Sequence, residues 1–253
     1  MPVRGEVLLN IVIITQARMS STRLPGKVLK EVLGQPLLVY HIERLKRVPS
    51  ATQVVVATTT NPADDAIVRV CEASGCAYVR GSEEDVLSRY HLAARAYSAD
   101  IVVRVTSDCP LIDPAVVDRI IRYYVEHRER MDYVANTVER TYPRGMDTEV
   151  FSFQALEEAH REAKLGYERE HVTPFFYTHP ERYRMGNVAY HTDVSHHRWT
   201  VDTPEDFELI RRIIEALYPE KQDFTLEDVL ALLDQHPEWT ALNAHVLQKR
   251  LGE

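Results

Sequence analysis

Three cationic side chains, Arg18, Arg23 and Lys27, follow a short apolar run that begins at Ile11. The run is too short to span a membrane and has the length of a buried strand. Ligands of open α/β sheets bind at the carboxyl ends of the strands, which is where this loop would lie. Cations and backbone N–H groups there would neutralise a polyphosphate and donate hydrogen bonds to it. The loop lacks the residue order of a P-loop, so it predicts a triphosphate site of another kind.

Two aspartates, Asp108 and Asp202, each come at the end of a predicted strand. An aspartate in such a place often caps the next helix. Here Asp113 and Thr203, each directly before a proline, explain the helix caps better. A carboxylate that faces a triphosphate needs a cation between the two negative groups, and Mg²⁺ is the usual one. We therefore predict that Asp108 and Asp202 bind one or two Mg²⁺ ions on the phosphates.

The elements that would position these residues alternate between strand and helix in the first half of the chain. The predicted strands are the run from Ile11 and residues 54–59, 77–80 and 101–106, and predicted helices follow Asn61, Ser82 and Asp113. The Ser82 hydroxyl is expected to cap its helix. Continuous apolar strands that alternate with helices indicate a parallel sheet with helices on both faces. The predicted fold class is therefore α/β, a three-layer α/β/α arrangement with a mostly parallel sheet.

The second half of the chain is less regular. We expect strands at 132–137, 147–153 and 199–201, and helices at 155–164, 204–217, 226–234 and 239–249. Residues 166–197 are rich in His, Tyr and Arg and have weak periodicity, as in segments that build substrate pockets or subunit contacts. We expect residues 131–197 to form an irregular insertion of this kind. Residues 223–253 would form a helical tail. The linker candidate 218–223 is short, so we expect a single domain over residues 1–253.

The composition excludes several functional classes. A formal net charge of −8 over 253 residues argues against binding to nucleic acid or to an anionic membrane. No segment has the length and apolarity of a membrane span, and no signal peptide is expected. The three cysteines, Cys71, Cys76 and Cys109, match no zinc or redox spacing. We expect reduced thiols in a cytoplasmic protein.

Three motifs occur in a fixed order along the chain. They are ARMSSTRLPGK at 17–27, SDCPLID at 107–113 and WTVDTPED at 199–206. In this order they resemble the cytidylyltransferases that make CMP-activated sugar acids, the acylneuraminate and CMP-Kdo synthetase group. Three further segments are similar to the spore-coat polysaccharide (SpsF-like) branch of that group: RGSEEDVLSRY at 80–90, EREHVTPF at 168–175 and LNAHVLQK at 242–249. Any one motif is weak evidence, whereas their joint order is specific.

The resemblance implies a nucleotide-diphospho-sugar transferase fold with a Rossmann-like sheet. It implies that CTP is bound by the first loop and the neighbouring strand ends, through Ala17, Arg18, Arg23, Lys27, Arg80, Ser82 and Thr106. It implies Mg²⁺ on Asp108 and Asp202, with Arg18, Lys27 and Asp108 acting in catalysis. It also implies a homodimer, in which residues 131–197 of one subunit approach the acceptor site of the other.

The acceptor side of the site is less defined by the sequence. The candidates are Arg144, Asp147, Arg169 and His171. A guanidinium group matches a sugar carboxylate in shape and charge, so Arg144 or Arg169 could bind one. Arg169 lies in a charge-rich run, and a solvated helix face explains it equally well. His196 and His197 are adjacent and would not share a helix face, so we interpret them as structural, and Trp199 as a core residue.

The predicted reaction is in-line transfer of CMP from CTP to a hydroxyl of a sugar acid, with release of pyrophosphate. Positioning and charge neutralisation would supply most of the catalysis, as in phosphoryl transfer generally. Two alternatives remain open at this stage. One is another enzyme of the same fold, a glycosyltransferase or a nucleotidyltransferase that acts on sugar 1-phosphates. The other is a nucleotide-binding homologue without activity.

Overall fold

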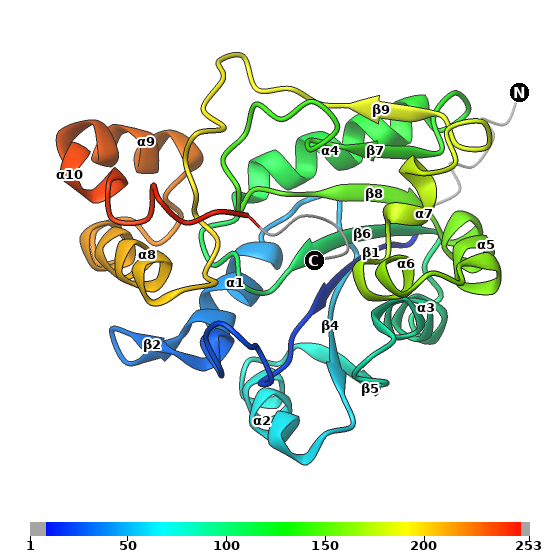
Figure 1. Ribbon diagram of the computed structural model, residues 1–253, viewed down its shortest axis with the longest axis horizontal. Coiled ribbons are helices and arrows are strands. Elements are labelled where there is room, and N and C mark those ends of the chain that lie inside the picture. Colours follow the sequence, from blue (N-terminus) through cyan, green and yellow to red (C-terminus); the bar gives the residue numbers. More distant parts are fainter. Residues whose placement is uncertain (1–8, 249–253) are drawn as a thin grey trace, which may run out of the picture.

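The computed structural model describes residues 9–248 and is built around one seven-stranded sheet (Figure 1). Its strands are β1 (Ile11–Gln16), β4 (Gln53–Thr59), β5 (Ala77–Gly81), β6 (Ile101–Thr106), β7 (Tyr133–Ala135), β8 (Glu149–Ser152) and β9 (Met185–Asn187). A separate two-stranded hairpin pairs β2 (Glu31–Val32) with β3 (Gln35–Pro36). The first-half strands form at the β-branched apolar runs, as the sequence predicts.

The helices connect and cover these strands. They are α1 (Leu37–Leu45), α2 (Asp65–Ala73), α3 (Val86–Ala96), α4 (Pro114–His127), α5 (Phe153–Glu162), α6 (Gly166–His171), α7 (Pro174–Tyr177), α8 (Pro204–Leu217), α9 (Leu226–Gln235) and α10 (Pro237–Thr240), with short 3₁₀ helices η1 (Lys27–Leu29) and η2 (Pro62–Asp64). Within residues 9–248, no helix combines the length and the apolar character that crossing a membrane requires.

The sheet is mostly parallel, as expected. The strand order is β5-β4-β1-β6-β8-β7-β9, and β5, β4, β1 and β6 pair in parallel. β8 runs antiparallel to both β6 and β7, and β9 pairs in parallel with β7. The irregular stretch 131–197 thus supplies three strands that extend the central sheet.

Successive residues of the central strands pack into two separate hydrophobic cores, one on each face of the sheet. Ile13 packs into the core beneath α1, α4, α8 and α9, whereas its neighbours Val12 and Ile14 pack into the core beneath α3, α5 and α7. Successive side chains of a strand point to opposite faces, so an uninterrupted apolar strand needs a helix layer on each side. Figure 1 shows α3, α5 and α6 grouped at one side of the sheet and α8, α9 and α10 at the other. The predicted three-layer α/β/α class is confirmed.

Several local predictions hold in detail. Asp113 caps α4 by accepting a hydrogen bond from the Ala115 backbone, and Thr203 caps α8 by accepting one from Asp206. Trp199 is fully buried, as a core residue should be. The three cysteines are buried free thiols. Because Asp113 and Thr203 cap α4 and α8, neither helix uses Asp108 or Asp202 as its cap.

Three local predictions are wrong. Ser82 does not cap α3; Asp85 does, because its carboxylate accepts from the Ser88 backbone at 2.9 Å, while the Ser82 hydroxyl accepts from the Asp85 backbone. Residues 199–201 form a loop and not a strand, since only a single bridge, between Arg144 and Arg198, forms beside them.

The third concerns the helix expected at 239–249. Only α10, residues Pro237–Thr240, is helical there, and Lys249 lies outside the described residues. A tertiary contact explains the early end: the Asn243 side chain donates to the Arg198 backbone oxygen at 2.9 Å and to Asp206 Oδ1 at 2.8 Å. This buried polar contact fixes the tail as a loop against the segment before α8.

Candidate active site

A cleft of about 770 Å³ opens at the carboxyl ends of β1 and β6. It is the position where ligands bind in open α/β sheets. Ten of the residues predicted for the site line it: Ala17, Arg18, Arg23, Lys27, Thr106, Asp108, Arg144, Asp147, His171 and Asp202. The fold thus brings together residues from the first loop, the end of β6, the stretch 131–197 and the loop before α8.

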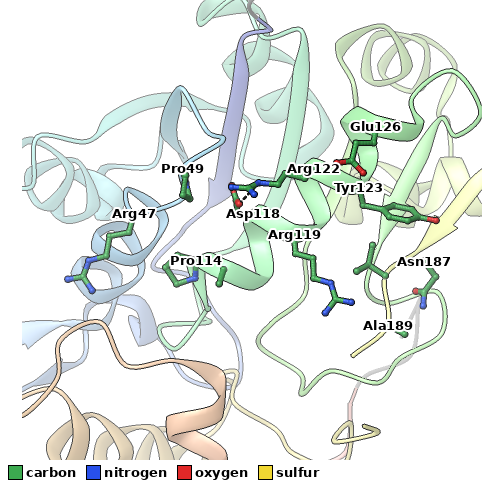
Figure 2. A pocket seen from close by; sticks show the side chains of 12 residues that line it. Arg47, Pro49, Pro114, Asp118, Arg119, Arg122, Tyr123, Glu126, Asn187 and Ala189 are labelled. Atoms are coloured by element: carbon green, nitrogen blue, oxygen red, sulfur yellow. Dashed lines mark ion pairs between the residues drawn. The ribbon is translucent and has the colours of Figure 1, made fainter. Parts of the chain in front are cut away.

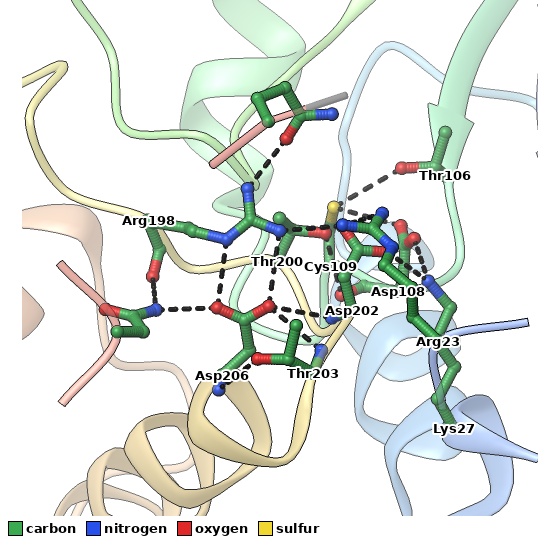
Figure 3. Close-up of polar contacts among 12 residues, drawn as sticks. Arg23, Lys27, Thr106, Asp108, Cys109, Arg198, Thr200, Asp202, Thr203 and Asp206 are labelled. Carbon is green, nitrogen blue, oxygen red and sulfur yellow. Dashed lines mark hydrogen bonds and ion pairs between the residues drawn. The ribbon is translucent and has the colours of Figure 1, made fainter. Parts of the chain in front are cut away.

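Lys27 joins the two predicted metal ligands. Its Nζ donates to Asp108 Oδ2 at 2.6 Å and to Asp202 Oδ1 at 2.7 Å (Figure 3). Gly26, directly before it, has φ +66°, a left-handed conformation that glycine adopts without steric cost. The Gly26 N–H donates to the Met19 backbone oxygen at 2.9 Å, which closes the loop and aims Lys27 at the carboxylates.

The charges of this cluster stabilise one another. Burial works against the charged form of Lys27, but the attraction of Asp108 and Asp202 outweighs it and raises the pKa of the ammonium. Burial likewise works against the ionised form of Asp108, but Lys27 holds the pKa of that carboxyl well below its usual range. Both groups are therefore charged at neutral pH, as a phosphate and metal site requires.

Two arginines complete the surroundings of Asp202. Its Oδ2 forms an ion pair with Arg23 Nη2 at 2.9 Å and accepts a hydrogen bond from Arg198 Nη2 at 2.7 Å. Arg198 also pairs with Asp206 at 2.9 Å, and its Nη1 donates to Gln248 at 2.7 Å. The Asp206 carboxylate in turn accepts from the Asp202 and Thr203 backbones. This network holds the loop between Arg198 and α8 in one conformation.

The Asp108–Asp202 pair fits a divalent cation. The Lys27 ammonium already stands between the two carboxylates, at a point where a positive charge is stabilised by both. Within residues 9–248 no cluster of three or more His, Cys, Asp or Glu side chains could bind a metal. Two carboxylates without further protein ligands suit Mg²⁺, which keeps several waters and completes its octahedron with substrate phosphates.

The loop that carries the cations is fastened to the neighbouring strand ends. The Met19 N–H donates to Asp64 at 2.7 Å, and the Ser20 hydroxyl donates to Glu83. Arg18 lies 3.9 Å from Glu83 and is well exposed on the cleft. These contacts fix the loop backbone and leave the Arg18 guanidinium accessible to an anion.

The acceptor candidates lie on the β7–β8 side of the cleft. Arg140 and Asp147 form a two-pronged ion pair with distances of 2.6 and 2.8 Å. The Arg144 guanidinium faces the same space and forms no hydrogen bond or ion pair within residues 9–248. Gly145 has φ +109°, and a Cβ there would lie 2.6 Å from the Trp199 backbone oxygen. Glycine is therefore required to bring Arg144 against the 199–201 loop.

His171 borders the same end of the cleft. Burial lowers its pKa, although the nearby Glu170 counteracts this. The imidazole is therefore neutral at pH 7 and can accept or donate a hydrogen bond without carrying charge.

Three predicted residues do not reach the cleft wall. Arg80 donates to the Thr59 backbone oxygen at 2.8 Å and pairs with Asp65 at 2.7 Å. Ser82 bonds the Asp85 backbone, as described above. Arg169 binds both carboxylate oxygens of Asp85 and donates to the His160 backbone oxygen at 2.7 Å. The donors of Arg169 thus tie α6 to the start of α3.

A comparison with known families decides the class of the protein. The family model described as cytidylyltransferase matches residues 11–231. The chain belongs to the cytidylyltransferase family. The resemblance drawn from the three motifs is confirmed, and the protein is a CTP-dependent nucleotidyltransferase.

Relatives of this cytidylyltransferase cover nearly its whole length. It is 30% identical over 236 residues to the spore coat polysaccharide biosynthesis protein SpsF of Bacillus subtilis, covering 90% of this chain and 96% of the relative. It is 34% identical to a cytidylyltransferase of known structure from Leptospira borgpetersenii, with a TM-score of 0.88 over 92% of this chain and 97% of that one. A CMP:2-keto-3-deoxy-manno-octonic acid synthetase solved with CTP shares the fold, at 20% identity and a TM-score of 0.62, over 82% of this chain and 99% of that chain.

Sequence reasoning missed part of the cytidylyltransferase cleft. Arg104 on β6 pairs with Glu149 on β8, and Glu149 also accepts from Tyr133 at 2.5 Å and from Thr173 at 2.7 Å. Burial works against the charge on Arg104, but Glu149 outweighs it and raises the pKa of the guanidinium. The signal was visible, because an arginine inside the run IVVRVT must have a buried partner. Arg198, four residues before Asp202, was likewise overlooked.

A second hollow, of about 700 Å³, lies along α4 (Figure 2). It is lined by Arg47, Arg119 and Arg122 among others, and Arg122 pairs with Asp118 at 2.7 Å. None of the predicted site residues lines it. The paired carboxylates and converging cations occur in the first cleft, which is therefore the candidate active site of the cytidylyltransferase.

Proposed function

We propose that this cytidylyltransferase transfers CMP from CTP to a hydroxyl of a sugar acid and releases pyrophosphate. The observation that carries the proposal is the Lys27 ammonium held between Asp108 and Asp202 on the floor of the cleft. This cluster combines a cation for phosphate oxygens with two carboxylates for a metal ion. Nucleotidyl transfer uses these two kinds of group, a cation that binds the phosphates and carboxylates that bind a metal ion.

The roles of the chain's own residues follow from their positions. When CTP enters, the phosphates offer Lys27 and Arg23 new anionic partners in place of Asp108 and Asp202. Arg18, exposed on the loop, would bind the outer phosphates. The two carboxylates are then free for Mg²⁺, which when bound would neutralise charge on the α-phosphate and orient the attacking oxygen. The three cations stabilise the departing pyrophosphate.

The acceptor would lie on the β7–β8 side of the cleft. Arg144 is suited to the carboxylate of a sugar acid, because its guanidinium has no protein partner within residues 9–248. Asp147, positioned by Arg140, and neutral His171 are suited to sugar hydroxyls. The relative SpsF, whose name refers to spore coat polysaccharide, supports a role in making an activated sugar for a surface polymer. We no longer propose Arg169 as a ligand, because its guanidinium donors bind the Asp85 carboxylate and the His160 backbone oxygen.

The experiment measures pyrophosphate release from each nucleoside triphosphate with Mg²⁺ and a panel of acceptors. The panel contains sialic-type and Kdo-type sugar acids, and sugar 1-phosphates as the alternative class. Release that requires CTP, Mg²⁺ and a sugar acid supports the proposal. Release only with a sugar 1-phosphate would overturn the acceptor class, and tight CTP binding without release from any acceptor would support an inactive homologue.

We also expect a homodimer, with residues 131–197 near the partner's acceptor site. The proposal rests on the resemblance to the family. Light scattering of the purified protein gives the mass in solution, and a mass near that of the single chain would contradict it.

A further inference from the structure

The loop that follows α10, residues 241–248, reaches the active-site cleft. It contains most of the segment LNAHVLQK, which is similar to the SpsF-like branch and has no role in the reaction proposed above. Leu242 packs against the larger hydrophobic core, and the next residue, Asn243, is buried. Gln248 lines the cleft at the other end of the loop. The loop thus connects the core of the protein to the edge of its site.

Two side chains of this loop converge on Arg198. Gln248 Oε1 accepts a hydrogen bond from Arg198 Nη1 at 2.7 Å, and Asn243 Nδ2 donates to the Arg198 backbone oxygen at 2.9 Å. Asn243 Nδ2 also donates to Asp206 Oδ1 at 2.8 Å, and Arg198 Nε donates to the same oxygen at 2.9 Å. The loop therefore contacts Arg198 at its backbone, at its guanidinium and through a shared carboxylate.

The same guanidinium binds Asp202 (Figure 3). Arg198 Nη2 donates to Asp202 Oδ2 at 2.7 Å and to Asp206 Oδ2 at 3.2 Å. Asp206 therefore binds one edge of the guanidinium, the edge between Nε and Nη2. A planar group that is bound along one edge can still tilt about that edge. Gln248 binds the remaining corner, Nη1, so that all three nitrogens are fixed.

This arrangement gives the two oxygens of Asp202 different surroundings. Oδ2 is bound by Arg198, whose side chain is only 6% exposed. Oδ1 faces Lys27 Nζ at 2.7 Å, on the side of Asp108. In the proposed reaction Lys27 moves to the phosphates, and Oδ1 is then the oxygen that faces a metal ion. A hydrogen bond that orients a metal-binding group is commonly worth about 10- to 100-fold in metal affinity.

A role in folding alone does not explain the contact of Gln248. Its side chain is exposed, and Leu247 before it is 85% exposed, so the end of the loop buries little apolar surface. Water could replace the Gln248 oxygen on Arg198 Nη1 at little cost in stability. Water would not hold the guanidinium at a fixed tilt toward Asp202, because it is not attached to the chain.

We propose that Asn243 and Gln248 are positioning residues of the active site, which hold Arg198 so that Asp202 presents Oδ1 to the metal ion. The inference rests on the metal role of Asp202 in the proposed function and adds the residues that orient this ligand. Neither residue of the loop touches the reacting atoms. The loop should therefore affect how tightly the complex with CTP binds Mg²⁺ more than it affects folding.

The test follows the melting temperature of the full-length protein with saturating CTP and no acceptor, as the Mg²⁺ concentration is raised. The readout is the Mg²⁺ concentration that gives half of the metal-dependent rise. Gln248→Met keeps the length of the side chain and removes the oxygen, whereas Gln248→Glu keeps an oxygen for Arg198. Arg198→Lys keeps the charge and removes the planar fork. Asn243→Ala removes the contact at the start of the loop.

Arg198→Lys should raise the half-maximal Mg²⁺ concentration by about 10- to 100-fold. Gln248→Met should raise it by about 3- to 10-fold, as expected for the loss of one hydrogen bond, and Asn243→Ala should change it in the same direction. Gln248→Glu should stay near the wild-type value. Leu247→Ala is the matched control, because this exposed side chain belongs to the same loop, and it should behave as the wild type.

A purely structural role would give a different result. It would lower the melting temperature at every Mg²⁺ concentration and leave the half-maximal concentration unchanged, which would overturn the proposal. A shift in Gln248→Glu as large as that in Gln248→Met would also overturn it, since the oxygen on Arg198 would then not matter. The Gln248 variants change an exposed side chain, so they test the proposal even if Arg198→Lys fails to fold.

One comparison separates this inference from the proposed function. If the wild-type protein with CTP shows no rise in melting temperature with Mg²⁺, the proposed metal site fails, and the inference fails with it. If the wild type shows the rise, and Arg198→Lys and Gln248→Met reach half of it at the same Mg²⁺ concentration, the inference alone is overturned.

Discussion

Lys27 and Asp202 are 175 residues apart in the chain, yet their charged groups lie 2.7 Å apart, and the same ammonium lies 2.6 Å from Asp108. A single ammonium therefore bridges both carboxylates, and Arg23 and Arg198 add positive charge at Asp202. Lys27 and a divalent metal ion would compete for this position. In the proposed reaction the phosphates of CTP would resolve the competition, because they would attract the ammonium and bring the metal with them.

Lys27→Met should change how the protein responds to metal alone. The variant leaves Asp108 without its cation, whereas Asp202 keeps Arg23 and Arg198. Removing one partner of such a largely buried pair should lower the free energy of unfolding by about 3 kcal/mol. Millimolar Mg²⁺ should restore much of this loss in the variant and have little effect on the wild type. Thermal unfolding with and without Mg²⁺ measures both. Lys164→Met, at an exposed lysine, is the control, and equal responses to Mg²⁺ in variant and wild type would contradict the competition.

Asp108→Asn should remove turnover without preventing folding. The amide cannot supply the negative charge that holds a metal on the phosphates, so we expect pyrophosphate release to fall by at least about 1000-fold. Lys27 keeps Asp202 as a partner in this variant, which limits the loss of stability. Asp193→Asn, at an exposed loop aspartate, should retain activity. Substantial turnover in Asp108→Asn would remove Asp108 from the proposed metal site.

Local sequence signals predict the parts of the fold that local forces determine. The β-branched runs that became β1, β4 and β6 are continuous and apolar, and the cations of the first loop stand directly after one of them. Caps at Asp113 and Thr203 were also readable, because each precedes a proline. With the strands ordered this way, Lys27 and Asp108 had to meet at one edge of the sheet.

What the sequence left undetermined depends on partners distant in the chain. Arg169 reads as a solvated helix residue or a ligand, and only the approach of α6 to Asp85 shows which donors are taken. Residues 199–201 have strand character but find only a single bridge, beside Arg144. Gln248 stands in a motif typical of the family branch, yet its contact with the loop before α8 is visible only when the tail lies against the cleft. Each of these features depends on tertiary contacts between residues distant in the chain, and the hydrophobic periodicity of a segment does not predict such contacts.

Arg144→Met and Arg169→Met should separate an acceptor contact from a structural one. Arg144 has no protein partner within the described part of the chain, so its loss should raise the KM for the sugar acid by about 10- to 100-fold and leave CTP binding unchanged. Arg169 joins α6 to Asp85 and His160, so its loss should lower the free energy of unfolding by about 1–3 kcal/mol and change the KM little. Steady-state kinetics and thermal unfolding of both variants provide the test. A higher KM for the acceptor in Arg169→Met, with an unchanged one in Arg144→Met, would reverse the assignment.

His41 should make the protein less stable in mild acid. The imidazole is fully buried, with Nε2 3.0 Å from the Thr15 hydroxyl and Nδ1 2.9 Å from the Cys109 backbone oxygen. Burial lowers the pKa of His41 from 6.5 to about 4, despite the opposing effect of the Cys109 hydrogen bond. Between these two values the unfolded chain binds a proton that the folded protein does not. The free energy of unfolding should therefore fall as the pH drops from about 6.5 to about 4, by up to roughly 3 kcal/mol from this group alone.

Urea unfolding at pH 7.5, 6.5, 5.5 and 5.0 would measure this dependence, and above pH 7 the His41 contribution should be flat. His197, whose pKa burial and His196 also lower to about 4, adds to the same pH range, so the wild-type slope alone does not isolate His41. His41→Gln removes one titrating group, and its slope should be shallower than that of the wild type even if the variant is less stable at every pH. His191→Gln, at an exposed histidine, is the matched control. An unchanged slope in His41→Gln would show that His41 does not resist protonation in the folded protein, and that the Thr15–His41–Cys109 contact does not require a neutral ring.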